Sequence, residues 1–207
     1  MKILLIGATG QTGRILLRKL PLLGHEVVAF ARNPKDVAEI DSRIHVVKGD
    51  ARDAASFGRA VAGVDSVISV FGPRSLKKDD IQESMMRNLE AAMRTAGVRR
   101  LINLSAAGVG DSLNEMPGIL RYVFVPLFLG RMYADKERGE RILFASSLEF
   151  VNVRPGRLLN HPARGGIKAQ FTVKNLKLEM TREDLADFMI AQLQNSEWIR
   201  KSPFIGY

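Results

Sequence analysis

The chain has 207 residues, of which 46% are hydrophobic and 26% charged, and it contains no cysteine. This length and composition are typical of one globular domain, and they exclude disulfide stapling, thiolate zinc sites and cysteine nucleophiles. The three histidines are scattered, so no metal site is predicted. The formal charge of +9 indicates a basic solvated exterior or an anionic small ligand rather than nucleic acid, because the Lys and Arg residues are spread out and lack interleaved aromatic residues.

Short apolar runs alternate with helical periodicities along the first 156 residues. Strands are predicted over residues 1–6, 25–32, 44–50, 66–72, 99–106 and 150–156. Helices are predicted over 12–23, 54–62 and from Asp79 or Asp80 to Thr95, where Gly97 ends the helix. Such strands, rich in Val, Ile and Leu, favour a parallel sheet covered on both faces. The predicted fold class is therefore α/β, a Rossmann-like doubly wound parallel sheet with ligands at the carboxyl ends of its strands.

The regular alternation of predicted strands and helices ends at Gly156. A glycine-rich turn at 164–166, a strand at 170–173 and a helix at 182–194 are expected, with Thr181 as the N-cap of that helix. We interpret residues 1–207 as a single dinucleotide-binding domain in which about 157–207 form a small C-terminal, substrate-side lobe.

The stretch GATGQTG places three glycines, Gly7, Gly10 and Gly13, between the first predicted strand and the first predicted helix. In this context Gly7 permits a tight turn, Gly10 lets a pyrophosphate approach the backbone, and Gly13 lets the helix pack on the strand. The N–H groups of the first helical turn favour an anion. A tight turn without a ligand is the alternative. Three neighbours belong to the same candidate phosphate site: Thr9, Gln11 and Thr12.

The second predicted strand ends at Arg32, where many dinucleotide folds carry a ribose-binding acid. An arginine can instead form charge-assisted hydrogen bonds to a 2′-phosphate. At about 1.5–3 kcal/mol, such bonds predict a roughly ten- to hundredfold preference for NADPH over NADH. An exposed loop cation is the alternative.

The third predicted strand ends at KGDARD. Asp50 is a candidate acceptor for the adenine amino group, and Ala51 offers backbone groups to the same ring. A helix N-cap is the alternative role for Asp50.

With GATGQTG, the arginine after the second strand, GDARD, SVFGP and the late VRPG, the chain resembles the atypical short-chain dehydrogenase/reductase superfamily. Within it, the chain is most similar to the NAD(P)H-binding branch that includes biliverdin reductase B-like flavin reductases. The resemblance covers almost the whole chain, including SPFIGY, and is more specific for fold and cofactor than for substrate. It implies that backbone groups of five residues line the dinucleotide: Val70, Phe71, Gly72, Pro155 and Gly156.

Members of this superfamily often carry a Ser on the fifth strand and a Tyr-x-x-x-Lys motif, in which the Lys lowers the Tyr pKa for proton exchange. This chain supplies Ser105 and Lys136, but Met132 stands four residues before the lysine. Tyr133 stands three residues before Lys136, so the two side chains share one face of the predicted helix and could form a displaced catalytic Tyr-Lys pair. The alternative is that Tyr133 packs against the protein or contacts solvent. Lys136 and Glu140 also resemble the K-x-x-x-E pattern of the atypical branch, in which the lysine reaches the nicotinamide ribose. An exposed Lys136–Glu140 salt bridge is the alternative.

The most apolar stretch outside the predicted sheet is Met116–Tyr133, which contains Arg121 and Arg131 near its two ends. It stands where the superfamily builds its substrate cover, so it is a candidate wall for a flat aromatic acceptor. Core packing and a dimer surface are the alternatives.

These observations predict an NADPH-dependent oxidoreductase that binds NADP(H) in preference to NAD(H) and passes hydride to a small conjugated acceptor such as a flavin or quinone. Such chemistry needs no protein acid, because the protein holds the nicotinamide against the acceptor and excludes water. A non-catalytic NAD(P)H sensor and an epimerase with bound NAD are the alternatives. The apolar run before Gly7 is too short for a signal peptide, and no apolar span reaches bilayer length. We therefore expect a cytoplasmic monomer or homodimer with a small-molecule substrate and without nucleic-acid or membrane partners.

Overall fold

A largely parallel sheet runs through the centre of the computed structural model, which describes residues 1–38, 44–72 and 80–207. Its strand order is β3-β2-β1-β4-β5-β6-β10-β8, and neighbouring strands are parallel except for β10 and β8. The order reverses beside β1, which confirms the predicted doubly wound fold. The strands are β1 (Lys2–Ile6), β2 (Glu26–Ala31), β3 (His45–Lys48), β4 (Ser66–Ser69), β5 (Arg100–Leu104), β6 (Glu149–Pro155), β8 (Lys168–Gln170) and β10 (Phe204–Gly206).

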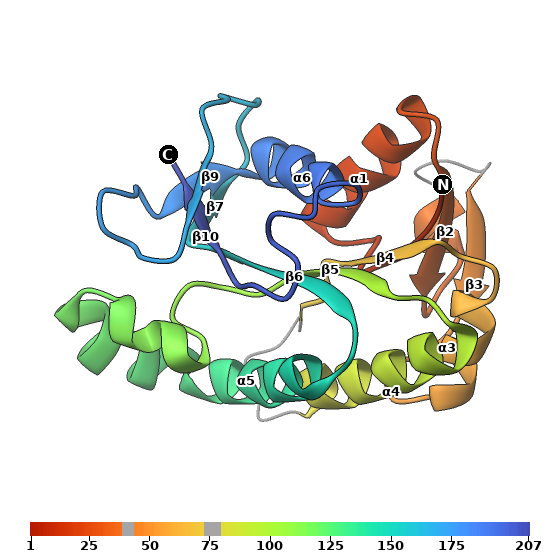
Figure 1. The fold of residues 1–207 in the computed structure, drawn as a ribbon, viewed down its shortest axis with the longest axis horizontal. Coiled ribbons are helices and arrows are strands. Elements are labelled where there is room, and N and C mark those ends of the chain that lie inside the picture. The colour runs from red at the N-terminus through yellow and green to blue at the C-terminus, as the bar shows by residue number, and fades with distance from the viewer. Residues whose placement is uncertain (39–43, 73–79) are drawn as a thin grey trace.

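Helices cover both faces of this sheet (Figure 1). On one face lie α1 (Gln11–Leu22) and α6 (Arg182–Ala191); on the other lie α3 (Ala54–Val61), α4 (Ile81–Ala96) and α5 (Gly130–Ala145). The short α2 (Lys35–Ala38) follows β2. The predicted helix start at Asp79 lies outside the described residues.

Apolar side chains on alternate sides of each strand form two core layers. In β1, Ile3 and Leu5 belong to the layer that contains the buried residues of α1 and α6, whereas Leu4 and Ile6 belong to the layer under α3 and α4. Successive strand side chains point to opposite faces, so a strand covered on both faces requires a continuous apolar run.

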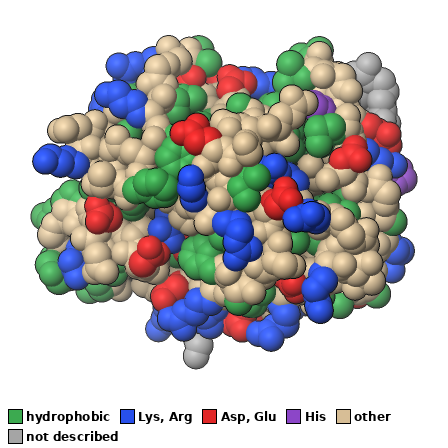
Figure 2. Space-filling model, viewed as in Figure 1, with side chains coloured by type: hydrophobic (Ala, Val, Ile, Leu, Met, Phe, Trp, Pro, Cys, Tyr) green, Lys and Arg blue, Asp and Glu red, His purple; other side chains and the backbone are tan. Residues whose placement is uncertain are grey.

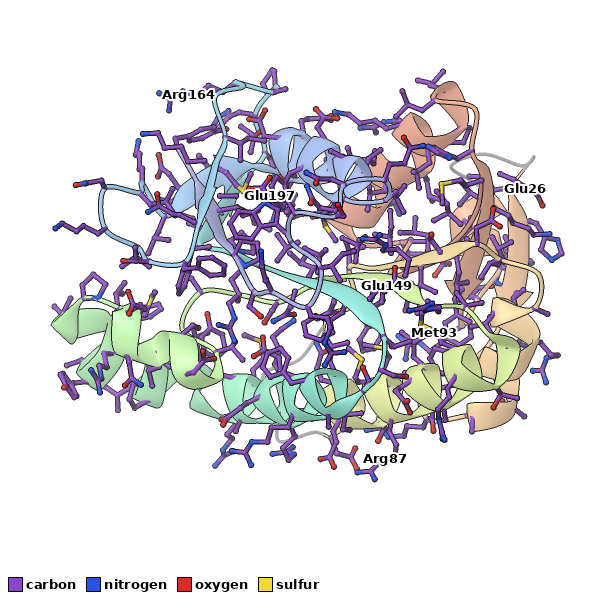
Figure 3. All side chains as sticks on the ribbon, in the orientation of Figure 1. Glu26, Arg87, Met93, Glu149, Arg164 and Glu197 are labelled. Atoms are coloured by element: carbon purple, nitrogen blue, oxygen red, sulfur yellow. The ribbon has the colours of Figure 1, made fainter. Side chains whose placement is uncertain are left out.

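The helices are amphipathic in the matching way. In α4, Met93 points toward the sheet and is fully buried, while Arg87 points away from the fold (Figure 3). Gly97 ends this helix with φ +72°, a left-handed conformation that glycine adopts easily, as the sequence predicts.

The C-terminal segment joins the central sheet through β10 and β8 and adds a two-stranded sheet of β7 (Arg157–Leu159) and β9 (Glu179–Thr181). The strand predicted at 170–173 is wrong. The strand ends at Gln170, whose side-chain amide donates to the carbonyls of Thr172 and Lys174, at 2.7 Å each, and so holds a turn. Thr181 caps α6 as predicted, accepting from the Asp184 N–H at 3.0 Å. The substrate-side role of this segment stays a prediction.

Between β5 and α5 the chain forms a 3₁₀-helix, η1 (Gly110–Glu115), and then a π-helix, η2 (Leu120–Leu129), which contains Pro126. The wide π-helical turn leads directly into α5 at Gly130. This segment extends from one end of the molecule, at the lower left of Figure 1, and contains most of the apolar stretch identified above.

Candidate functional site

The carboxyl ends of β1, β2, β3 and β4 border a cleft of about 350 Å³. Nine of the residues predicted to bind the dinucleotide line it: Gly7, Thr9, Gly10, Arg32, Asp50, Ala51, Val70, Phe71 and Gly72. The cleft therefore lies where ligands bind in doubly wound folds, outside the strand ends and beside the reversal of strand order.

The three glycines serve three different purposes. Gly7 has φ +86°, and a Cβ atom there would lie 2.7 Å from the Val70 carbonyl oxygen. A Cβ atom on Gly13 would lie 2.2 Å from the carbonyl oxygen of Gly7, so only glycine lets α1 approach the end of β1 this closely. Gly10 has more room, with 3.3 Å between a Cβ atom and the Gly7 oxygen, and it borders the cleft. This arrangement leaves the backbone open to a ligand at Gly10.

The first turn of α1 fits a phosphate. Its N-cap, Gly10, offers no side-chain acceptor, and the turn holds no acidic residue. The first N–H groups of a helix have no intrahelical acceptor, and the helix dipole favours an anion beside them. Gln11, Thr12 and Gly13 form this turn rather than the cleft lining. A dinucleotide pyrophosphate would find both the donors and the space it needs.

Arg32 is exposed at the rim of the cleft, directly after β2. Across residues 1–38, 44–72 and 80–207 it has no ion-pair partner. Asp36, which lines the same cleft, instead accepts from the amide of Asn33 at 2.7 Å. The guanidinium is thus available to an anionic group of a ligand.

Asp50 does not cap α3, so the N-cap alternative is wrong. Its carboxylate accepts from the Arg52 N–H at 2.9 Å, while Asp53 caps the helix by accepting from the Ala55 N–H at 3.0 Å. Asp50 therefore shapes the turn after β3 and lies in the cleft lining, where the role toward adenine stays a prediction.

Phe30 and Gly49 also line the cleft, and sequence reasoning missed both. A Cβ atom on Gly49 would lie 2.3 Å from the Phe30 ring, which stacks on Phe57 at 4.6 Å between centroids. The signal in the sequence was an aromatic residue two positions before Arg32. In the structure Phe30 pairs with Val47, two residues before the glycine of KGDARD. This close packing sets the floor of the cleft between β2 and β3.

Ser105, Tyr133 and Lys136 gather at the carboxyl end of β5, but each is already engaged with the protein. The Tyr133 hydroxyl donates to the Ala107 carbonyl at 3.2 Å, and the Lys136 ammonium donates to the Leu104 carbonyl at 3.0 Å. Ser105 is buried and donates to Glu140. Ser105 and Lys136 do not line the cleft described above, so their contact with a cofactor stays a prediction.

The pKa values of these groups differ from those of the expected Tyr-Lys pair. Burial raises the pKa of Tyr133 above its usual value, whereas the expected pair requires a lowered one. Burial lowers the pKa of Lys136 to about 8, against the opposing attraction of Glu140 and Asp135. The tyrosine is held as a neutral phenol that donates to a backbone carbonyl, which makes it a weak acid.

Glu140 forms no surface salt bridge with Lys136, so that alternative is wrong. Its side chain is only 2% exposed and forms an ion pair with Arg154 of β6 at 2.8 Å. It also accepts from the Asn152 amide at 2.8 Å. Arg154 belongs to VRPG, where sequence reasoning considered only the backbone after it, so this buried centre was missed.

Pro155 and Gly156 make close backbone contacts within the protein. The Pro155 carbonyl accepts from the Ala107 N–H at 2.8 Å, and a Cβ atom on Gly156 would lie 2.1 Å from the Leu178 carbonyl oxygen. Neither lines the 350 Å³ cleft. Their predicted contact with the nicotinamide half of a cofactor stays a prediction.

A second, wider cleft of about 470 Å³ lies between α1, the start of α6 and the residues after β7. Arg182 lines it and donates to the Asn160 side chain at 2.7 Å and to the Leu158 carbonyl at 3.1 Å. Ile15 lies on its α1 side, two residues after Gly13, the last glycine of the glycine-rich stretch. This position, near the first turn of α1, makes it a candidate for the acceptor.

The apolar stretch Met116–Tyr133 lines neither of these two clefts. Only Met116 and Val125 of it are buried, so core packing does not account for its exposed side chains. Its role as a substrate cover stays a prediction.

Comparison with known proteins agrees with this geometry. A family model described as NAD(P)H-binding matches residues 7–196. The chain belongs to this NAD(P)H-binding family. The match begins at the first glycine of the cleft and includes every element of the sheet except β1 and β10. The expected membership of the atypical short-chain dehydrogenase/reductase branch is confirmed.

Proteins similar to this chain carry epimerase and reductase names. The chain is 28% identical over 206 residues to the uncharacterized sugar epimerase YhfK of Bacillus subtilis (strain 168), covering 93% of this chain and 88% of that protein. A putative NAD-dependent epimerase/dehydratase structure from Bacillus halodurans is 25% identical, with a TM-score of 0.81 and coverage of 99% and 93%. ChuY of Escherichia coli O157:H7, an anaerobillin reductase, shares the fold at 24% identity, with a TM-score of 0.82 and coverage of 100% and 97%. The chain thus shares the fold of these two solved structures over nearly its whole length.

Proposed function

We propose that this protein is an NADPH-dependent reductase that passes hydride to a small conjugated acceptor such as a flavin or quinone. The observation that carries the proposal is the state of Ser105 and Tyr133. Both hydroxyl groups are committed to acceptors within the protein, so the described site favours chemistry that needs no acid from the protein. A conjugated acceptor meets this condition, because hydride addition gives it a delocalised negative charge, and this anion would take up its proton from solvent after it leaves the site.

Arg32 supports the choice of NADPH. It stands exposed at the rim of the cleft and is not paired with any residue of the described ranges. A 2′-phosphate would gain charge-assisted hydrogen bonds there, whereas the ribose hydroxyl of NADH offers no comparable charge. The first turn of α1 would hold the pyrophosphate.

The bound dinucleotide would supply the hydride, and the protein would supply position and shelter. Lys136 lies at the carboxyl end of β5, where it would orient a ribose hydroxyl of the bound dinucleotide. The 470 Å³ cleft beside α1 would receive the acceptor, with Arg182 and His161 in its lining. Holding the nicotinamide and the acceptor face to face, with water excluded, would lower the barrier to hydride transfer without a catalytic acid.

Titration of the purified protein with NADPH and NADH, followed by addition of a flavin or an ortho-quinone, tests the proposal. The expected result is tighter binding of NADPH and rapid loss of reduced-nicotinamide absorbance with at least one acceptor. Binding without oxidation by any acceptor would instead favour the non-catalytic NAD(P)H sensor. A Tyr133→Phe variant is the matched probe of the proton source, and its turnover is expected to stay within about twofold of wild type.

An epimerase with bound NAD is the second candidate, favoured by the name of the relative YhfK. An epimerase returns its hydride to the substrate, so it consumes no NADPH and leaves the bound nicotinamide unchanged after each turnover. Incubation with nucleotide sugars in deuterated water, followed by NMR, would separate the two candidates. Epimerised product without net oxidation of NADPH would replace the reductase proposal.

A further inference from the structure

Residues 119–128 present an apolar surface that the fold does not cover. Six large side chains are exposed there, including Ile119 at 73%, Leu127 at 72%, Tyr122 at 69% and Phe128 at 60%. The complete set is Ile119, Tyr122, Val123, Phe124, Leu127 and Phe128, which we call the apolar face. Figure 2 shows hydrophobic side chains gathered at the lower left, where Figure 1 places this segment.

The apolar face is one side of a well-anchored element. A π-helix has a wider turn than an α-helix, and residues four to five apart, such as Ile119, Val123 and Leu127, return to the same side. On the other side Val125 is buried and Leu120 packs against the small core layer that contains Met116. The exposed side chains are therefore held outward by the packing of their neighbours.

The segment that carries the apolar face is basic. Residues 116–134 contain Arg121 and Arg131 and no acidic residue. The acid that follows, Asp135, is buried and accepts hydrogen bonds from the N–H groups of Gln82 and Glu83. The exposed acid that precedes the segment is Glu115. The chain as a whole has a formal charge of +9, so its long-range field attracts an anionic surface.

We propose that the apolar face binds an anionic lipid bilayer at its interface. Apolar and aromatic side chains flanked by arginines have the composition of segments that lie at the headgroup boundary. The arginines would contact lipid phosphates while Leu127 and Phe128 enter the acyl boundary. Across the described ranges, no helix is long and apolar enough to cross a bilayer, so the contact is with one surface only. This proposal replaces the expectation that the protein has no membrane partner.

A second copy of the chain fits this face less well. A two-fold dimer places the same patch of both copies in contact, so Arg121 and Arg131 of one copy would enter an interface that holds the same arginines of the other copy. With no acid between residues 116 and 134, these like charges would lack neutralising partners within the patch. An anionic bilayer supplies the complementary charge that a second copy lacks.

Flotation with vesicles tests the proposal without requiring turnover, so its failure is distinct from failure of the reductase proposal. The protein is mixed with phosphatidylcholine vesicles containing about 30% phosphatidylglycerol, and with pure phosphatidylcholine vesicles. The wild type is expected to float with the anionic vesicles and to be released at about 0.5 M salt. Leu127→Asp and Phe128→Asp are each expected to weaken binding about tenfold or more. Arg121→Gln and Arg131→Gln are expected to weaken it about fivefold each.

Leu22→Asp is the matched control, because Leu22 is an 85% exposed leucine at the end of α1. Figure 1 shows α1 on the face of the sheet opposite α5, the helix into which the apolar segment leads. Leu22→Asp is expected to leave flotation unchanged, and unchanged melting temperatures would show that every variant is folded. Absence of wild-type flotation, or an equal loss in Leu22→Asp, would overturn the proposal. So would a wild-type dimer, seen by light scattering, that Leu127→Asp dissociates, since the occupant would then be a second copy.

Discussion

Glu140 of α5 and Arg154 of β6 form an ion pair of 2.8 Å, with both side chains less than 5% exposed. The pair joins a helix on one face of the sheet to a central strand, and Glu140 also accepts from Ser105 at the end of β5. Burial disfavours the charge on Arg154, but its contacts with Glu140 and Asp111 raise its pKa above the usual value. The pair therefore holds together the three elements around the candidate site.

Removing one partner of this ion pair should be costly. Arg154→Met leaves the Glu140 carboxylate buried without its countercharge, and we expect a loss of about 3–5 kcal/mol in the free energy of unfolding. Glu140→Gln combined with Arg154→Met should lose less than the sum of the two single variants, because neither member of the ion pair is then left buried without the other. Urea denaturation of the four proteins measures this cycle. Strictly additive losses would show that the pair does not act as a unit.

Gly13 should tolerate no side chain. In Gly13→Ala the Cβ atom would lie 2.2 Å from the Gly7 carbonyl oxygen, so α1 must move away from β1. We expect a loss of about 1–3 kcal/mol in unfolding free energy and weaker NADPH binding. Gly58→Ala in α3 is the control, because nothing lies within 4 Å of its Cβ position. It should gain about 0.4–1 kcal/mol. A neutral Gly13→Ala variant would contradict the predicted close approach.

Arg32→Ala should weaken the binding of NADPH and leave the binding of NADH nearly unchanged. We expect the affinity for NADPH to fall roughly ten- to hundredfold, since hydrogen bonds to charged groups contribute about 1.5–3 kcal/mol. The affinity for NADH should stay nearly constant, because NADH carries no 2′-phosphate. Calorimetric titration of both dinucleotides checks this. Equal losses for both, or no loss for either, would remove Arg32 from the 2′-phosphate site.

Asp184 should make the C-terminal segment sensitive to acid. Burial opposes ionisation of its carboxyl group, but hydrogen bonds from the Tyr207 hydroxyl, the Arg164 and Gly165 N–H groups and Thr181 lower its pKa from 3.8 to about 2. Figure 3 shows Arg164 on the loop that these bonds tie to α6.

A carboxyl group whose folded pKa lies below its unfolded value stabilises the fold above the unfolded value. This stabilisation, on the order of 2 kcal/mol, should be complete above about pH 4 and decline as the pH falls toward 2. Asp184→Asn should lose it at neutral pH and show a flatter acid limb. Urea midpoints between pH 2 and 7 measure the difference. Parallel pH profiles for the two proteins would contradict the assignment.

Local signals in the sequence were enough to predict most of the sheet and half of the site. The strands and glycine turn were predictable because Gly7, Gly10 and Gly13 follow one apolar run and precede a helical one, which leaves few alternatives for the backbone. Gln170 shows where local reasoning failed: its side chain closes a turn that β propensity alone would have continued as a strand.

The sequence by itself determined the doubly wound sheet, the glycine-rich turn that borders the 350 Å³ cleft and the position of Arg32, because each depends on residue spacing within one or two neighbouring elements. Tertiary structure decided the partners of Glu140 and the exposure of the apolar face. Glu140 lies four residues from Lys136, but it contacts Arg154, 14 residues along the chain. Whether an apolar helix is buried or exposed depends on which distant segments pack over it, and the spacing of its own residues does not show this.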